Sequence, residues 1–168
     1  MVDDEEIIRQ QIHGFIKKQK PESEISDFST GEELLAAGRE FDIIFLDIQM
    51  EGMGGIEAAR ILRQRNADAV LVFITGIKEY VFEAFDVSAF HYLLKPIAEQ
   101  KFMEVLGRAA GEAGKRKVQK EQQIFIRTKN QGYTLNLSSI LYIENRGKKV
   151  EIHTTDMEEI IEAYATME

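Results

Sequence analysis

Five side chains of the kinds that take part in phosphoryl chemistry directly follow short apolar runs in this sequence. They are Asp3, Asp4, Asp47, Thr75 and Lys95. Each apolar run is expected to form a buried strand of one parallel sheet. The carboxyl ends of such strands meet at one edge, where ligands bind. We therefore expect these five side chains to converge, although they lie far apart in the sequence.

The residue types at this edge suit the transfer of a phosphoryl group. Clustered carboxylates with few other ligands favour Mg²⁺, which prefers oxygen and keeps several waters. Close like charges should raise the pKa of at least one carboxyl when no metal is bound. The Asp47 carboxylate is able to act as a nucleophile and become an aspartyl phosphate. The Lys95 ammonium would neutralise negative charge on the oxygens of the phosphoryl group during its transfer. The Thr75 hydroxyl would donate a hydrogen bond to the phosphoryl group once it is attached to Asp47.

Short apolar runs alternate with helical patterns over the first 110 or so residues. The runs that predict buried strands are Ile43–Leu46, Ala69–Ile74 and Ala89–Leu94. Helices are expected after the capping-box residues Ser29–Glu33 and over Gly55–Arg65, Lys78–Phe85 and Ala98–Ala110. This alternation predicts an α/β fold, a doubly wound parallel sheet covered by helices on both faces.

The apolar period changes to about two after residue 123. Short strands are expected at Ile124–Arg127, Tyr133–Leu137, Ile140–Glu144 and Val150–Thr154, whereas Glu158–Tyr164 is compatible with strand or helix. Three glycines interrupt the helical pattern before residue 115, and a highly charged stretch follows. We therefore expect one domain over 1–112, a linker or solvated helix extension over 113–123, and a mostly antiparallel β segment over 124–168.

Composition excludes several classes of protein. The chain has 168 residues, no cysteine and a formal charge of −8. The lack of cysteine excludes disulfide scaffolds, thiol catalysis and cysteine-based zinc sites. No apolar run approaches the ~20 residues that span a bilayer, so we expect a cytoplasmic protein with no membrane partner. The negative charge excludes a general nucleic-acid binder, because Lys and Arg drive binding to polyanions.

Four sequence blocks resemble the receiver domain of two-component response regulators. The blocks are Val2–Glu5, Phe45–Met50, Phe73–Gly76 and Tyr92–Pro96, and their order and spacing both match over about residues 1–110. The resemblance implies a flavodoxin-like fold and a phospho-acceptor that a sensor histidine kinase phosphorylates. By this resemblance the phospho-acceptor is Asp47, and the activity is signal transduction rather than enzymatic turnover.

The same resemblance assigns roles to the residues around the acceptor. Asp4 would bind Mg²⁺ directly, and Asp3 would assist through water. Asp47 and the backbone carbonyl of Gln49 would complete the protein ligands. Thr75 and Lys95 would contact the phosphoryl group, and the aromatic side chain of Tyr92 would relay the signal.

Residues 124–168 resemble the N-terminal part of a LytTR-type DNA-binding domain. The blocks that carry this likeness are Ile124–Thr128, Leu137–Glu144 and Val150–Thr154. The resemblance implies that the full-length protein binds DNA, regulates transcription and forms a homodimer when phosphorylated. Arg146, Lys148 and Lys149 are candidate DNA contacts, with solvated turn charges as the alternative interpretation.

The chain departs from both families in several places. Only two apolar residues precede the acidic pair, so the central first strand is expected to be largely missing. The β segment is less than half of a LytTR-type domain, so we expect a fragment at both ends. Glu51 stands where receivers usually have proline, and Gly54-Gly55 replaces an Asp-Gly or Asn-Gly pair. The loop after Asp47 is therefore expected to be flexible.

Two other functions are compatible with the acidic cluster. The first is a Mg²⁺-dependent phosphatase with an aspartyl nucleophile, but such enzymes need a second acid two residues later, where this chain has Gln49. The second is a binding module with a receiver fold that is not phosphorylated. The three histidines are isolated in the sequence, and we assign them no metal or catalytic role.

Overall fold

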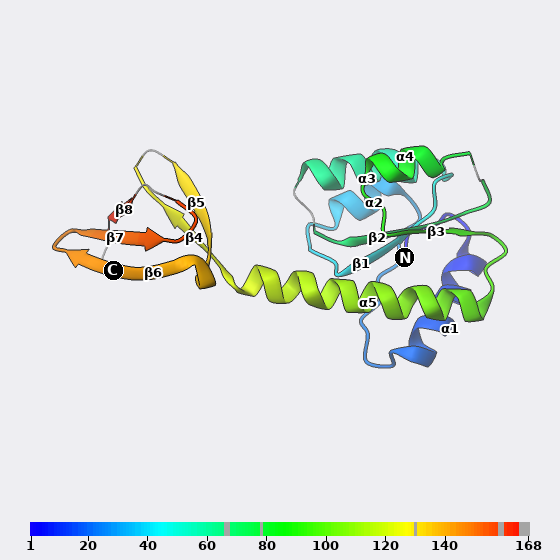
Figure 1. Cartoon of the computed structure of the whole chain (residues 1–168). Helices are drawn as coiled ribbons and strands as arrows, with labels where there is room; N and C mark the ends of the chain where they lie inside the picture. Colours follow the sequence, from blue (N-terminus) through cyan, green and yellow to red (C-terminus); the bar gives the residue numbers. More distant parts are fainter. Residues whose placement is uncertain (66–67, 78, 130, 158–159, 165–168) are drawn as a thin grey trace. The chain divides into compact units, whose positions relative to one another are not determined.

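The structure is a computed structural model that describes residues 1–65, 68–77, 79–129, 131–157 and 160–164. The chain divides into two compact units, Met1–Gly114 and Lys115–Glu168. Figure 1 shows helices around a sheet in the first unit and only strands after the long helix α5 in the second. Among the described residues, no helix has the length and apolar character needed to cross a membrane.

The first unit is built on a parallel sheet with strand order β1-β2-β3. The strands are β1 (Ile43–Leu46), β2 (Val70–Thr75) and β3 (His91–Leu94). Ile43 lies opposite Val70, and Phe73 lies opposite Tyr92. Every residue of β2 is buried, as expected for a central strand covered on both faces. The predicted parallel α/β sheet is confirmed.

Val2 occupies the place of the first strand. It forms parallel bridges to Phe28 on one side and to Leu46 on the other. Its amide donates to the carbonyl of Phe45, and its carbonyl accepts from the amide of Asp47, both at 2.9 Å. A single bridged residue therefore stands between Phe28 and β1, which gives the doubly wound order with its first strand largely missing.

Helices cover both faces of this sheet (Figure 1). They are α1 (Glu6–Gln19), α2 (Gly31–Ala36), α3 (Gly55–Gln64), α4 (Val81–Asp86) and α5 (Glu99–Glu121). The α1 and α5 side chains pack with Val70, Val72 and Ile74 in one buried cluster. Those of α2, α3 and α4 pack with Leu71 and Phe73 in another. Successive side chains of β2 thus point to opposite faces of the sheet and contribute to two hydrophobic cores, one on each face.

The helix starts and ends differ from the sequence predictions in two places. The helix predicted over Lys78–Phe85 begins at Val81 in the structure, and Lys78 lies outside the described residues. Helix α5 continues to Glu121 and therefore covers most of 113–123, which the sequence left open between a linker and a helix extension. Each glycine inside it costs about 1 kcal/mol relative to alanine. Burial of Leu106 and Ala109 against the sheet offsets that cost over the first turns.

After the end of α5, the second unit is built mainly of short antiparallel strands. A hairpin pairs β4 (Gln123–Arg127) with β5 (Gly132–Asn136), and the 3₁₀ turn Leu137–Ser139 follows. A three-stranded sheet has the order β6 (Ile140–Arg146), β7 (Lys149–Thr154) and β8 (Ile161–Tyr164). Its core contains Leu135, Ile152 and Ile161. The segment 158–164, left open by the sequence, is a strand over Ile161–Tyr164, while 158–159 lie outside the described residues.

Candidate functional site

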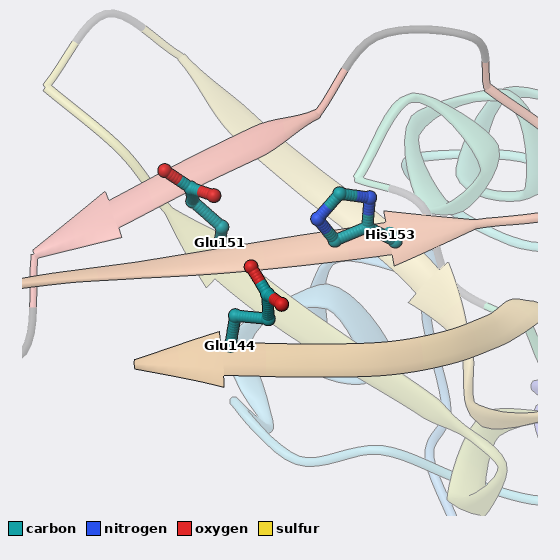
Figure 2. Close-up of side chains that lie close together, drawn as sticks. All are labelled: Glu144, Glu151 and His153. Atoms are coloured by element: carbon teal, nitrogen blue, oxygen red, sulfur yellow. The ribbon is translucent and has the colours of Figure 1, made fainter. Parts of the chain in front are cut away.

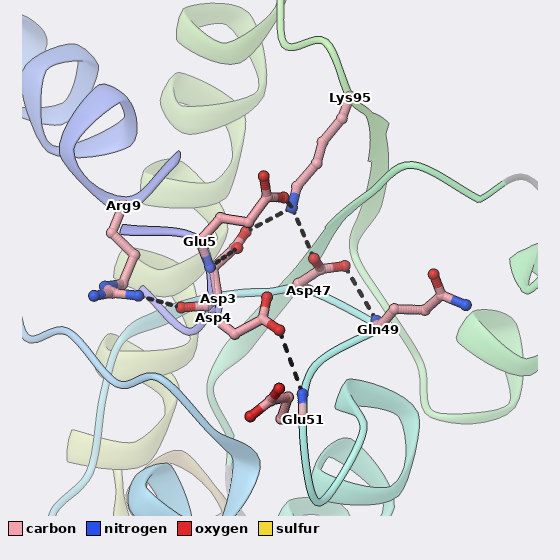
Figure 3. Close-up of polar contacts among 8 residues, drawn as sticks. All are labelled: Asp3, Asp4, Glu5, Arg9, Asp47, Gln49, Glu51 and Lys95. Carbon is pink, nitrogen blue, oxygen red and sulfur yellow. Dashed lines mark hydrogen bonds and ion pairs between the residues drawn. The ribbon is translucent and has the colours of Figure 1, made fainter. Parts of the chain in front are cut away.

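Three carboxylates meet at the carboxyl edge of the parallel sheet (Figure 3). Asp3 and Asp4 follow the bridged residue Val2, and Asp47 follows β1. One oxygen of each carboxylate lies within 4.8 Å of the others. Asp3 is 0% exposed and Asp47 is 4% exposed, whereas Asp4 is exposed to solvent. The structure therefore brings together the three acidic residues that the sequence placed at one edge.

The Lys95 ammonium lies among these carboxylates. Its Nζ atom is 2.7 Å from Asp47 Oδ2, 2.7 Å from Glu5 Oε1 and 3.0 Å from Asp3 Oδ2. Burial alone would lower the pKa of Lys95, but the hydrogen bonds to Asp47, Glu5 and Asp3 outweigh burial and raise it. Three carboxylates therefore contact one ammonium, and the Asp4 carboxylate lies within 4.8 Å of those of Asp3 and Asp47.

The Asp3 carboxyl is held in an unusual environment. Burial raises its pKa above the ordinary value of 3.8. The hydrogen bond from Lys95 and the amide of Glu5 oppose this effect, and the charge of Asp47 adds a smaller increase. The raised pKa expected from clustered carboxylates is present, but its main cause is burial rather than repulsion between like charges.

The loop after Asp47 is held against the carboxylates. The amide of Gln49 donates to Asp47 Oδ1 at 3.2 Å, and the amide of Glu51 donates to Asp4 Oδ2 at 3.4 Å. A Cβ atom at Gly55 would lie 1.9 Å from the carbonyl oxygen of Asp47. Glycine is therefore required at this position for close approach of two backbone segments, whereas the sequence suggested only a flexible loop.

Thr75 and Tyr92 lie on the neighbouring strands β2 and β3. Thr75 is fully buried, and its Oγ1 atom has no hydrogen-bond partner in the part of the chain that the structure describes. Tyr92 is half-buried, and its hydroxyl donates to the carbonyl of Ile77. The centre of its ring lies 6.4 Å from that of Phe73. A buried hydroxyl without a partner carries a desolvation cost, which a ligand oxygen would relieve.

The carboxylate cluster fits Mg²⁺. All of its donor atoms are oxygens, the ligand type that this hard cation prefers. Asp3 Oδ2 is buried and lies 3.0 Å from the Lys95 ammonium, and a carboxylate oxygen has a second lone pair with which to bind a cation. The excess of negative charge around Lys95 favours a divalent cation. Asp3, Asp4 and Asp47 are the side chains that would hold it.

A second cluster lies on the antiparallel sheet of the other unit (Figure 2). Glu144 on β6 and Glu151 and His153 on β7 each place one ligand atom within 4.8 Å of the others. The guanidinium of Arg146 lies 2.9 Å from Glu144 Oε2 and 3.5 Å from Glu151 Oε2. The Tyr142 ring stacks on His153. Because the Arg146 guanidinium already contacts both carboxylates, we assign no metal ion to this cluster.

This second cluster was not predicted, because each histidine is isolated in the sequence. The signal was the alternation of Glu151 and His153, which places both side chains on one face of a strand. The pairing of Glu144 with Glu151 depends on the register between β6 and β7, which a local pattern does not reveal.

The three candidate DNA contacts lie at the turn between β6 and β7. Arg146 is engaged by the two glutamates described above, and Lys149 Nζ lies 2.6 Å from Glu162 Oε2. Lys148 is exposed in the turn itself. Carboxylates therefore offset two of the three positive charges. The contact of these residues with DNA stays a prediction.

Comparison with known proteins identifies the first unit. Residues 1–107 match the family described as response regulator receiver domain. The response regulatory domain of protein mrkE from Klebsiella pneumoniae has a similar structure, with a TM-score of 0.64 and 29% sequence identity, over 68% of this chain and 95% of that one.

Similarity to two longer proteins extends the comparison. Sensory transduction protein LytT from Oceanobacillus iheyensis is 26% identical over 159 residues, which cover 91% of this chain and 65% of that protein. Transcriptional regulatory protein BtsR from Escherichia coli is 34% identical over 120 residues, or 70% of this chain and 50% of BtsR. The chain thus spans only part of the length of these relatives. From the family match over residues 1–107, we conclude that this chain belongs to the response regulator receiver family.

Proposed function

We propose that this chain is part of a two-component response regulator that accepts a phosphoryl group on Asp47 from a sensor histidine kinase. The observation that carries the proposal is the position of the Asp47 carboxylate. It is nearly buried, lies 2.7 Å from the Lys95 ammonium and shares a site with two further carboxylates. The names of LytT and BtsR, a sensory transduction protein and a transcriptional regulator, support control of transcription as the output.

The chemistry is a single displacement at phosphorus. An oxygen of the Asp47 carboxylate forms a bond to phosphorus, while the bond from phosphorus to the imidazole nitrogen of the kinase breaks and that nitrogen leaves with its electron pair. Lys95 lies beside the accepting oxygen and stabilises the charge of the phosphoryl oxygens. Mg²⁺ bound by Asp3, Asp4 and Asp47 would neutralise further charge on these oxygens, and the Gln49 carbonyl is a further candidate ligand.

The response to phosphorylation involves Thr75 and Tyr92. The unpartnered hydroxyl of Thr75 is suited to donate a hydrogen bond to a phosphoryl oxygen. Tyr92 lies on the next strand opposite Phe73, which is on the same face of β2 as Thr75. A shift of Thr75 toward the phosphoryl group would therefore be passed to the Tyr92 ring through this face of the sheet. Phosphorylation shifts an existing equilibrium between two arrangements. The output is homodimerisation and DNA binding through a LytTR-type region that begins in residues 124–168.

The proposal treats the protein as a phospho-acceptor rather than a phosphatase with rapid turnover. Gln49 occupies the position where an aspartyl-nucleophile phosphatase has its general acid, and an amide does not supply a proton at neutral pH. We therefore expect stoichiometric labelling of the chain and slow loss of the label.

Labelling of the full 168-residue chain tests the proposal. Incubation with Mg²⁺ and acetyl phosphate should add one phosphoryl group, detected as a mass increase of the intact protein. Asp47→Asn should abolish the increase, because the amide keeps the shape but is a poor nucleophile. Asp42→Asn removes an exposed carboxylate from the opposite end of β1 and should be labelled like the wild type. Labelling that survives Asp47→Asn would refute the assignment.

A further inference from the structure

Glu5 directs its carboxylate toward Lys95 instead of capping its own helix. It is the residue that precedes α1 and has extended backbone angles, but its side chain makes no capping hydrogen bond. Ser, Thr, Asp and Asn are the side chains that ordinarily accept from the first amides of a helix, and the longer Glu side chain is not a preferred cap. Glu5 Oε1 instead lies 2.7 Å from Lys95 Nζ, 90 residues away in the sequence (Figure 3).

The Lys95 ammonium lies at equal distances from Glu5 and the phospho-acceptor, with Asp3 slightly farther away. Its Nζ atom lies 2.7 Å from Glu5 Oε1 and 2.7 Å from Asp47 Oδ2. The Lys95 side chain is 15% exposed, whereas the Glu5 side chain is 55% exposed. Glu5 therefore holds the ammonium from the solvent side of the site. Asp47 holds it from the buried side.

Attachment of a phosphoryl group to Asp47 increases the negative charge that the Lys95 ammonium must stabilise. The acyl phosphate carries a charge of about −2, in place of the single negative charge of the Asp47 carboxylate. The phosphoryl oxygens are stabilised by the positive charge of Lys95. The Glu5 carboxylate, which takes no part in the transfer, competes with them for this ammonium. Glu5 also adds one negative charge to a site where carboxylates already outnumber cations.

We propose that Glu5 is a positioning residue that restrains Lys95 and lowers the affinity of the site for a phosphoryl group. This inference rests on the proposed function, because it assigns a control of the same site. Glu5 keeps the unphosphorylated protein in a state that resists small phosphoryl donors. Removal of its charge releases the Lys95 ammonium toward the phosphoryl oxygens.

The variant Glu5→Gln, which keeps the size of the side chain and removes its charge, tests the proposal. The first readout is the dissociation constant for beryllofluoride, a phosphoryl analogue, measured with Mg²⁺ on the full chain. The second is the half-saturating concentration of acetyl phosphate for labelling. A half-exposed ion pair contributes a modest free energy, so we expect both values to fall about two- to fivefold.

Glu6→Gln is the matched control. It removes the same charge from the adjacent residue, whose carboxylate is exposed and accepts from the Gln10 side chain. It should leave both values at those of the wild type. Equal values for Glu5→Gln and Glu6→Gln, or weaker beryllofluoride binding by Glu5→Gln, would overturn the role of Glu5. Absence of labelling in the wild type would instead defeat the proposed function itself.

Discussion

The backbone amide of Lys95 donates a hydrogen bond to the carbonyl of Thr75 across 2.9 Å. This bond joins the residue after β3 to the last residue of β2, yet the two side chains differ in their hydrogen bonding. The Lys95 ammonium contacts three carboxylates, whereas the Thr75 hydroxyl contacts no hydrogen-bonding partner among the described residues. Before phosphorylation the Lys95 ammonium is therefore already paired with carboxylates, whereas the Thr75 hydroxyl is available to donate a hydrogen bond.

Substitution of Thr75 by valine should raise the stability of the protein and weaken its response to phosphorylation. Thr75→Val keeps the side-chain shape and removes a buried hydroxyl that has no partner, so the free energy of unfolding should rise by about 1 kcal/mol. Labelling of Asp47 should persist, because Thr75 does not supply the nucleophile. Dimerisation of the labelled variant should be weaker than that of the labelled wild type, since the hydrogen bond to the phosphoryl group is lost. Denaturant titration and analytical ultracentrifugation measure the two effects.

Thr75→Ser provides the control for this experiment. It restores the hydroxyl and should recover phosphorylation-dependent dimerisation. Equal dimerisation of the labelled wild type and Thr75→Val would show that the hydroxyl takes no part in the response.

The buried Asp3 carboxylate should make the metal-free protein less stable as the pH rises. Because burial raises the pKa of Asp3 in the folded state, that state binds more protons than the unfolded chain above about pH 4. The stability associated with this group is present at low pH and is lost as the pH rises through the raised pKa. Asp3→Asn should therefore stabilise the protein by an amount that grows from pH 4 toward pH 7.

Chemical denaturation of both proteins at several pH values, with and without Mg²⁺, measures this difference. Mg²⁺ should stabilise the wild type more than Asp3→Asn, because the variant lacks one carboxylate of the cluster. A stability difference that stays constant between pH 4 and pH 7 would contradict the assigned role of burial.

Two glycine substitutions should have opposite effects on stability. Gly55→Ala places a Cβ atom 1.9 Å from the carbonyl oxygen of Asp47, so the backbone must shift, at a cost of about 1–3 kcal/mol. Because the shifted segment carries the phospho-acceptor, labelling should also slow. Gly14→Ala in α1 meets no atom within 4 Å and should stabilise the helix by up to about 1 kcal/mol. Thermal unfolding of the two variants compares them, and equal stability would contradict the close contact.

Local sequence signals were sufficient to predict the sheet and the meeting of its acidic residues. An apolar run such as that of β2 indicates a buried strand, and parallel strands bring the residues that follow them to one edge. This is why Asp47 and Thr75 could be placed together without any knowledge of tertiary contacts. The same logic placed Lys95 beside them.

Features that depend on side-chain direction could not be predicted in the same way. The contact between Glu5 and Lys95 depends on how the start of α1 is set against β3, and no local pattern reports that relation. The close approach of Gly55 to Asp47 likewise depends on the path of a loop. The sequence left 113–123 open between a linker and a helix extension, because its glycines and charged residues give opposite local signals, and α5 continues to Glu121.

The 168-residue chain should bind duplex DNA weakly and without sequence preference. Arg146, Lys148 and Lys149 can neutralise at most about three phosphates, which corresponds to a salt slope near −2.7. The slope should be shallower than this value, because Arg146 and Lys149 are paired with glutamates. Fluorescence anisotropy between 50 and 200 mM salt, with a promoter duplex and a scrambled duplex, measures both slope and preference.

Release of Arg146 from its partners should strengthen this weak binding. The double substitution Glu144→Gln and Glu151→Gln removes both carboxylates that contact the guanidinium, so the slope should steepen by about one. Glu57→Gln removes an acidic charge from α3 in the other unit and should leave the slope unchanged. Tight binding of the wild-type chain to one promoter, with little affinity for the scrambled duplex, would show that residues 124–168 read sequence by themselves. In that case the pairing of Arg146 with its glutamates would not limit recognition.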